Sequence, residues 1–126
     1  MRVRALSVRQ PYADLLVQGK KTMEVRSYQT RHRGPLLICS TARPVLDGHA
    51  LGHAIGIVEV VGCRLMEPSD AAAACADYQP GAYVWIVEQG RAIEPFPVKG
   101  RQTQFEINHP SLSRAETSAP GLFEYD

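Results

Sequence analysis

The chain has 126 residues, 44% of them hydrophobic, and a formal net charge of +1 at pH 7. This length suffices for one domain that buries its own core without disulfides or a structural metal. No run approaches the roughly 18–20 apolar residues of a membrane span, and the first four residues lead into a strand and not into a signal-peptide core. We therefore expect a soluble, cytoplasmic protein with no membrane partner.

The first predicted elements are a strand, a helix and a second strand. Residues 3–8 are mostly apolar and predict the first strand. The helix that follows is bounded by Pro11, which loses no useful hydrogen bond at a helix start, and by Gly19, which supplies a left-handed residue after the last turn. Side chains then alternate along residues 23–26, so this strand presents Glu24 on the face opposite to the core.

Later strands are predicted where apolar and β-branched residues cluster. Residues 35–40 are apolar enough to be buried on both faces, and residues 54–64 form the most hydrophobic strand, which should lie centrally. Ser69 is predicted to cap a short helix that extends to about residue 76. The remaining predicted elements are a strand over residues 82–88, an edge or bulged strand over 92–99 and a last strand over 104–107.

Strands outnumber the two short helices, and this balance predicts an α+β fold. The expected architecture is a closed or nearly closed mixed β-barrel of about six strands with short helices at its ends. We assign residues 1–107 to this domain. Residues 108–126 are rich in Pro, Ser, Thr and Glu and are expected to form a C-terminal tail that is flexible or draped over the surface.

The charges are divided unevenly along the chain. Residues 1–43 hold nine Lys or Arg and two acidic side chains, whereas the remaining 83 residues hold five basic and eleven acidic ones. Clustered cations favour a polyanionic partner such as nucleic acid. The alternative is that the two halves interleave in the fold and cancel each other.

The chain offers no strong pattern for a metal or a cofactor, and we predict neither. Cys39, Cys63 and Cys75 are odd in number and widely separated, which favours reduced thiols in a reducing compartment. His49 and His53 would suit one metal on a helix, but a glycine lies between them and no acidic residue is next to them. Glycine-rich phosphate loops and nucleophile motifs are absent as well.

The strongest candidate site combines Lys21, Glu24 and Arg26 with Gln10 and Tyr12 from the helix start. A lysine near a carboxylate in a cleft can act as a base or nucleophile, or can contact a phosphate. The alternative is an exposed Glu24–Arg26 ion pair worth at most about 1 kcal/mol, with no function.

Aromatic residues near cations form a second candidate constellation. Its members are Tyr12, Tyr28 and Trp85 with Arg9, Arg31, Arg33 and Lys99. Bases stack on aromatic rings while cations follow the phosphates, so the mixture suits single-stranded or looped nucleic acid. Within this set we expect Trp85 in the core and Tyr12 in the cleft.

Several ordered blocks together resemble the ASCH (activating signal cointegrator homology) domain family of the PUA-like superfamily. They cover about residues 5–107 and read LSVRQPYA (6–13), GKKTMEVRSY (19–28), HRGPL (32–36), GIVEV (56–60) and FPVKG (96–100). Within that family they are most similar to the C-terminal domain of the eukaryotic transcription coactivator that names it. The resemblance implies a PUA-like β-barrel whose cleft, floored by residues 19–26, binds RNA or another nucleic acid.

The resemblance also implies an alternative function as an enzyme, because some members of the family are enzymes. Small bacterial relatives hydrolyse the amide of acetylated cytidine with a lysine that falls on Lys21 and a threonine that falls on Glu24. The glutamate in place of that threonine argues against the same reaction in this chain. Other relatives cleave RNA, and Lys21 or Tyr12 would take part in such chemistry here.

Three hypotheses result. The first is a module that binds RNA, another nucleic acid or a nucleotide-like small molecule through Arg9, Gln10, Tyr12, Lys20, Lys21, Thr22, Glu24, Arg26, Tyr28, Arg31 and Arg33. The second is a hydrolase acting on a modified nucleoside or on RNA, with Lys21 as base or nucleophile and with Glu24 and Tyr12 as further catalytic residues. The third is an adaptor for a protein partner, in which the basic rim binds an acidic peptide.

Overall fold

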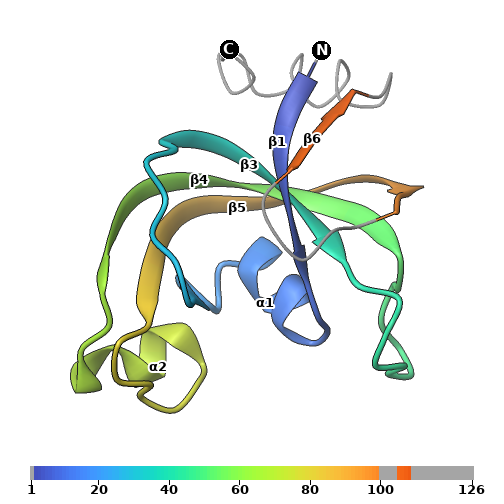
Figure 1. Cartoon of the computed structure of the whole chain (residues 1–126). Helices are drawn as coiled ribbons and strands as arrows, with labels where there is room; N and C mark the ends of the chain where they lie inside the picture. The colour runs from blue at the N-terminus through green and yellow to red at the C-terminus, as the bar shows by residue number, and fades with distance from the viewer. Residues whose placement is uncertain (1, 100–104, 109–126) are drawn as a thin grey trace.

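The computed structural model describes residues 2–99 and 105–108. Its elements are β1 (Arg2–Val8), α1 (Tyr12–Val17), β2 (Met23–Arg26), β3 (Gly34–Ser40), β4 (His53–Leu65), a 3₁₀ turn η1 (Pro68–Asp70), α2 (Ala71–Ala74), β5 (Tyr83–Pro97) and β6 (Phe105–Asn108). The six strands form one sheet in the order β2-β5-β4-β3-β1-β6, in which β1 and β3 are parallel and the other neighbours antiparallel. The sheet curls into a half-barrel around α1 (Figure 1), which confirms the predicted α+β fold of one mixed sheet with few, short helices.

Two glycines allow α1 to lie close against the sheet. A Cβ on Gly90 would lie 2.4 Å from the Leu16 carbonyl oxygen, and one on Gly56 would lie 2.5 Å from a Val17 methyl group. Both distances are shorter than a carbon atom tolerates, so only glycine permits this approach. The packing sets the height of α1 above β4 and β5, and with it the position of Tyr12 at the helix start.

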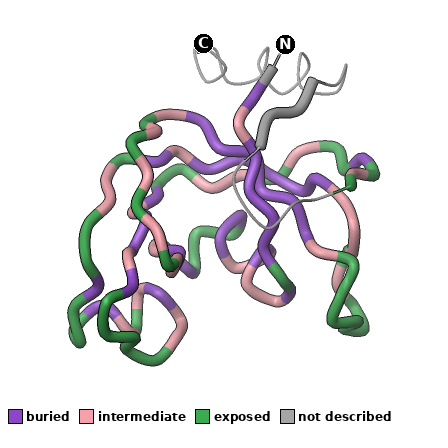
Figure 2. Tube along the Cα trace, viewed as in Figure 1, coloured by how far each residue is buried: buried purple, intermediate pink, exposed green. Residues whose placement is uncertain are grey.

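The core lies on both faces of the sheet. Its buried residues are drawn purple in Figure 2. In β3, Leu36 and Ile38 pack with α1 on the concave face, whereas Leu37 and Cys39 pack with Phe96 on the other face. The prediction that residues 35–40 are buried on both faces is therefore confirmed.

The predicted elements agree with the structure in most places. Residues 23–26 form β2 as expected, and β4 occupies an interior position of the sheet. The segments predicted as two strands over 82–88 and 92–99 are one strand, β5, whose register against β4 shifts at three places. The shift between Ala54 and Gly56 lies opposite residues 92–96 of β5, which include Pro95, and is the bulge that the prolines indicated. The other two shifts lie opposite residues 86–91, outside the segment for which a bulge was predicted.

The predicted helix cap at Ser69 is wrong. Glu67 is the N-cap of the turn η1. Its side chain accepts from the Asp70 backbone N–H, and the Asp70 side chain accepts from the backbone N–H of Glu67. Pro68 then occupies the first position of the turn, where its missing N–H is harmless. The reciprocal acidic cap displaces the expected start by two residues.

The proposed tail, residues 108–126, lies outside the described residues except for Asn108, which ends β6, so the division into a domain over 1–107 and a tail stays a prediction. Across the described parts of the chain, no helix has the length and apolar character that crossing a membrane requires.

Candidate functional site

The turn between α1 and β2 brings Lys21 into the molecule while leaving Lys20 outside. Gly19 has φ +78°, the left-handed conformation predicted for it. The backbone N–H groups of Lys20 and Lys21 both donate to the Leu15 carbonyl at 3.0 Å, which closes the helix tightly. As a result the Lys20 side chain is exposed, whereas Lys21 is only 3% exposed.

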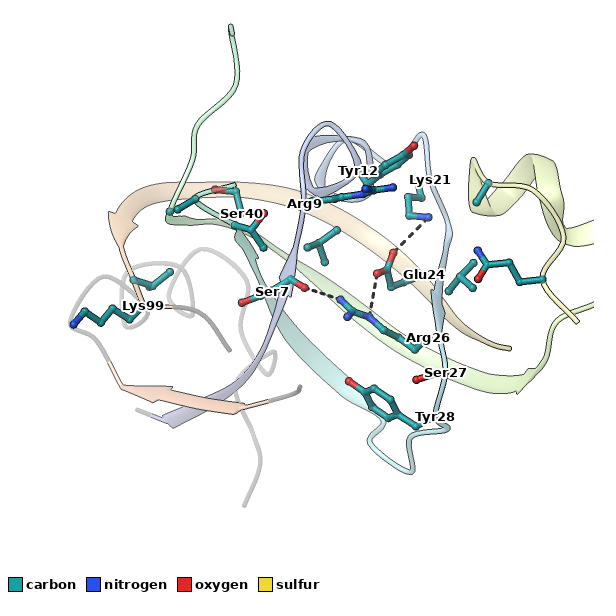
Figure 3. Close-up of a pocket in the computed structure, with 18 residues that line it drawn as sticks. Ser7, Arg9, Tyr12, Lys21, Glu24, Arg26, Ser27, Tyr28, Ser40 and Lys99 are labelled. Atoms are coloured by element: carbon teal, nitrogen blue, oxygen red, sulfur yellow. Dashed lines mark hydrogen bonds and ion pairs between the residues drawn. The ribbon is translucent and has the colours of Figure 1, made fainter. Parts of the chain in front are cut away.

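Lys21, Glu24 and Arg26 form a partnered charge cluster, which we call the cleft floor. Lys21 Nζ lies 3.4 Å from Glu24 Oε1, and Arg26 Nε lies 3.1 Å from Glu24 Oε2 (Figure 3). Lys21 also donates to the Ala74 carbonyl of α2, and Arg26 Nη2 donates to the Ser7 carbonyl at 2.6 Å. The Glu24–Arg26 pair is thus largely buried, with side chains 11% and 17% exposed, and is not the exposed pair considered above.

The cleft floor borders a cleft of about 1020 Å³. Its lining residues are Ser7, Val8, Arg9, Tyr12, Lys21, Glu24, Val25, Arg26, Ser27, Tyr28, Ser40, Thr41, Ala42, Gly52, Ala76, Gln79, Val98 and Lys99. Four of them are cationic and Glu24 is the one carboxylate among the lining residues that the structure describes. The cleft therefore has an excess of positive charge. In this part of the molecule, acidic residues from the second half of the chain do not cancel the basic residues of the first half.

Aromatic residues lie where the sequence placed them. The Tyr12 ring lies 5.4 Å from the Arg9 guanidinium carbon and 5.5 Å from Lys21 Nζ, so two cations contact its faces or edges. Trp85 is fully buried, packs edge-on against Tyr28 with centroids 5.6 Å apart, and donates from Nε1 to the Tyr28 carbonyl. The predictions of Trp85 in the core and Tyr12 in the cleft are confirmed.

Five predicted binding residues do not line this cleft: Gln10, Lys20, Thr22, Arg31 and Arg33. Gln10 is buried and its Nε2 donates to Asp14 Oδ1 and to the Ala50 carbonyl, so it joins the helix start to the loop that precedes β4. The other four side chains are exposed. Their contact with a ligand stays a prediction.

Several cleft residues were missed by sequence reasoning. Ser7, Ser40 and Thr41 come from the ends of β1 and β3, and Gln79 follows α2. One indication of them was present in the sequence, a serine near the end of each of two otherwise apolar strands. The parallel pairing of Val8 with Ser40 brings these ends together, and a pairing partner cannot be deduced from either segment alone.

The contacts of His49, His53 and the three cysteines do not indicate a metal site within the described residues. His49 Nδ1 lies 2.5 Å from Asp14 Oδ2, and His53 Nδ1 lies 2.8 Å from the Leu51 carbonyl oxygen. No group of three or more potential metal ligands occurs within the described ranges. All three cysteines are free, and burial raises the pKa of the Cys39 thiol to about 12, which makes that thiol unreactive.

Comparison with known proteins agrees with the fold and the sequence blocks. The ASCH domain model matches residues 6–101. The human protein Activating signal cointegrator 1 is 58% identical over 38 residues, a segment that covers 30% of this chain and 6% of the human protein. The chain thus spans only a small part of that relative.

Solved structures of bacterial proteins show the same fold. The crystal structure of ASCH from Zymomonas mobilis has a TM-score of 0.69 and 16% identity, covering 90% of this chain and 93% of that one. A point mutant of that protein has a TM-score of 0.63 and 15% identity, covering 92% and 96%. Because the family model matches most of its length, the chain belongs to the ASCH domain family.

Proposed function

We propose that the cleft binds RNA or a related nucleotide ligand. The observation that carries the proposal is the combination, in one cleft, of a buried carboxylate in the floor, an aromatic ring beside it and cations at the rim. Membership of the ASCH family supports it, because this family is generally thought to bind RNA.

Floor and rim have separate roles in this proposal. Lys21 and Arg26 are engaged by Glu24, so they hold its carboxylate in place at the cleft surface. That carboxylate can accept hydrogen bonds from the amino group of a base. Arg9 and Lys99 are exposed and line the same cleft, where they can reach phosphates.

The test is binding of a fluorescent single-stranded RNA, measured by anisotropy at a series of salt concentrations. Lys99→Gln should weaken binding of all sequences alike and reduce the salt slope by about 1. Glu24→Gln should change base preference among homopolymers. It should not lower the salt slope, because it removes a negative charge and leaves Lys21 and Arg26 without their shared carboxylate. Arg43→Gln is the matched control, because Arg43 is exposed but does not line the cleft.

Failure to bind any RNA or DNA pool, or binding independent of salt, would overturn the proposal. Equal affinity for an acidic peptide would favour the adaptor hypothesis.

A second candidate function is hydrolysis of a modified nucleoside or of RNA. Lys21 Nζ borders the cleft beside both Glu24 and the Tyr12 ring, an arrangement in which a lysine can act as base or nucleophile. Glu24 would have to supply the acid–base chemistry, since no second carboxylate lines the described part of the cleft. Incubation with acetylated cytidine and with a mixed RNA pool tests it. Turnover that is lost in a folded Lys21→Ala protein would support it, and no turnover by the wild type would refute it for these substrates.

A further inference from the structure

The free edge of β2 opens into the cleft. β2 is the outermost strand of the sheet on its side, where it pairs with β5 and with no other strand of the described chain. Side chains alternate between the two faces of a strand, so a cleft that followed one face of β2 would contact every second residue. Instead three consecutive residues, Glu24, Val25 and Arg26, all line the cleft. The cleft therefore passes over the edge of β2, where the backbone is accessible.

The register of β2 against β5 decides which backbone groups lie on this edge. The Val87 N–H donates to the carbonyl of Thr22, one position before β2, at 3.0 Å, so position 22 is hydrogen-bonded to β5. In an antiparallel pair, hydrogen-bonded and non-hydrogen-bonded positions alternate. Glu24 and Arg26 therefore turn their N–H and C=O groups toward β5. Val25 turns its N–H and C=O away from β5, toward the free edge.

These two groups of Val25 are held in place but have no partner. Neither has a hydrogen-bond partner among the residues that the structure describes. The Val25 side chain packs on the other face of β2, against the buried cluster of Met66, Ala74 and Val84. Met23 has the same orientation and packs against the same cluster, but it does not line the cleft. Val25 therefore presents a fixed donor and a fixed acceptor to a ligand in the cleft.

The surroundings of this edge carry a net positive charge. Arg26 Nη2 donates to the Ser7 carbonyl at 2.6 Å and so reaches from β2 across to β1 (Figure 3). Lys21 and Arg26 bring two positive charges and share the single carboxylate of Glu24. A positive environment favours a ligand that also carries negative charge, as a nucleotide does.

The paired donor and acceptor select one part of a nucleotide. A phosphate oxygen can only accept, so it would be attracted by the Val25 N–H and repelled by the neighbouring carbonyl oxygen. An added peptide strand needs a row of outward residues, and in the described part of β2 Val25 alone combines the outward orientation with the cleft lining. The edge of a nucleobase carries a donor and an acceptor side by side, which is the complement of one outward strand residue.

We propose that the backbone N–H and C=O of Val25 read the edge of a nucleobase bound in the cleft. This inference rests on the proposed nucleotide binding and adds which groups of the protein contact the base.

The first experiment removes the donor. Val25→Pro lacks the N–H, and proline is tolerated on an edge strand where that N–H does not serve the ladder. Met23→Pro is the matched control, because it makes the same change on the same edge outside the cleft lining. The probes are fluorescent RNA pentamers of A, of C and of U, and an abasic pentamer that keeps ribose and phosphate. Val25→Pro should weaken binding of the base-bearing pentamers about threefold to tenfold, the value of one hydrogen bond, and leave binding of the abasic pentamer unchanged. Met23→Pro should change neither.

The second experiment uses the wild type, so it does not depend on the folding of a variant. Amide hydrogen exchange is followed by NMR with and without the same pentamers. In the free protein the Val25 amide should exchange faster than the amides of Glu24 and Arg26, which bond to β5. The base-bearing pentamers should slow exchange at Val25 and leave exchange at Met23 unchanged.

The outcomes separate the base contact from its alternatives and from the proposed function. Equal loss of affinity for the abasic pentamer would assign the Val25 N–H to a phosphate and overturn base reading. Slower exchange at Val25 with an acidic peptide, but not with RNA, would indicate strand addition and overturn it as well. If the wild type binds RNA with the expected salt dependence and neither experiment singles out Val25, the base contact is overturned while the proposed function stands. If the wild type binds no RNA, both fail.

Discussion

The floor and the rim of the cleft both carry cations, yet they are built in opposite ways. In the floor, Lys21 and Arg26 are largely buried and each has a carboxylate partner and a backbone carbonyl. At the rim, Lys99 is exposed and has no hydrogen-bond or ion-pair partner among the described residues. Buried charges must be paired because they have lost their water, whereas exposed charges keep theirs. Floor charges therefore maintain the shape of the cleft, and rim charges remain available to a ligand.

The largest expected effect comes from breaking the floor. Lys21→Met would leave the Glu24 carboxylate without one of its two cations in a buried setting and would remove the link to Ala74 of α2. Loss of one partner from a buried pair costs about 3–5 kcal/mol, and because this cluster retains Arg26 we expect the lower end, about 3 kcal/mol. Urea unfolding followed by circular dichroism measures it.

The neighbouring lysine provides the matched control for that experiment. Lys20 is exposed, so Lys20→Met should change the free energy of unfolding by no more than about 0.5 kcal/mol. Equal destabilisation by the two substitutions would contradict the division between floor and rim.

The next effect concerns the support under Tyr12. Gly90→Ala would place a Cβ 2.4 Å from the Leu16 carbonyl oxygen, which is rigid backbone of α1. The helix must shift away from the sheet, and we expect a loss of about 1–3 kcal/mol of stability together with weaker ligand binding.

Gly62→Ala tests whether the clash, and not the loss of a glycine, is responsible. Its Cβ would meet only the end of the Ile86 side chain at 3.3 Å, which can move aside. Thermal melts of both variants should show a clear fall for position 90 and little change for position 62. Comparable falls at the two positions would refute the proposed role of close helix packing.

The extent to which the sequence predicted the site differs between its parts, and the reason is physical. The limits of β2 and the stop at Gly19 follow from local chemistry, so both were predicted from a few neighbouring residues. The contact between Lys21 and Ala74 joins residues 53 positions apart, and it depends on α2 packing beside β2. No local pattern reports such a contact. The expected cap at Ser69 was wrong for a related reason, since Glu67 and Asp70 compete better for the same backbone groups.

A smaller effect is expected behind the floor, at the pair that anchors α2. Arg64 donates to both Asp70 oxygens, at 2.7 and 2.9 Å, and this hydrogen bonding lowers the pKa of the Asp70 carboxyl from 3.8 to about 2. A carboxyl whose pKa is lower in the folded state stabilises the fold above its ordinary pKa of 3.8, and this contribution is lost as the pH falls toward 2. Arg64→Leu should therefore lower the melting temperature at neutral pH, and the difference from wild type should shrink as the pH falls through that window.

Arg43→Leu is the control for that pH series, because Arg43 is exposed, pairs with no carboxylate among the described residues and leaves Asp70 its partner. A melting-temperature difference between wild type and Arg64→Leu that stays constant from pH 7 to pH 2 would show that the pair does not contribute through Asp70 ionisation.

The smallest effect on stability is expected at the rim, and that is what makes it informative. Lys99→Gln removes an exposed cation that has no partner within the described residues, so the free energy of unfolding should change by less than about 0.5 kcal/mol. The same substitution should lower the salt slope of RNA binding by about 1, because one fewer phosphate counterion is released. Lys21→Met should instead cause a large loss of stability, because it removes a buried partner of Glu24. If Lys99→Gln destabilised the protein and left the salt slope unchanged, Lys99 would belong to the structural charges, and Arg9 would be the exposed cation that remains in the described cleft lining.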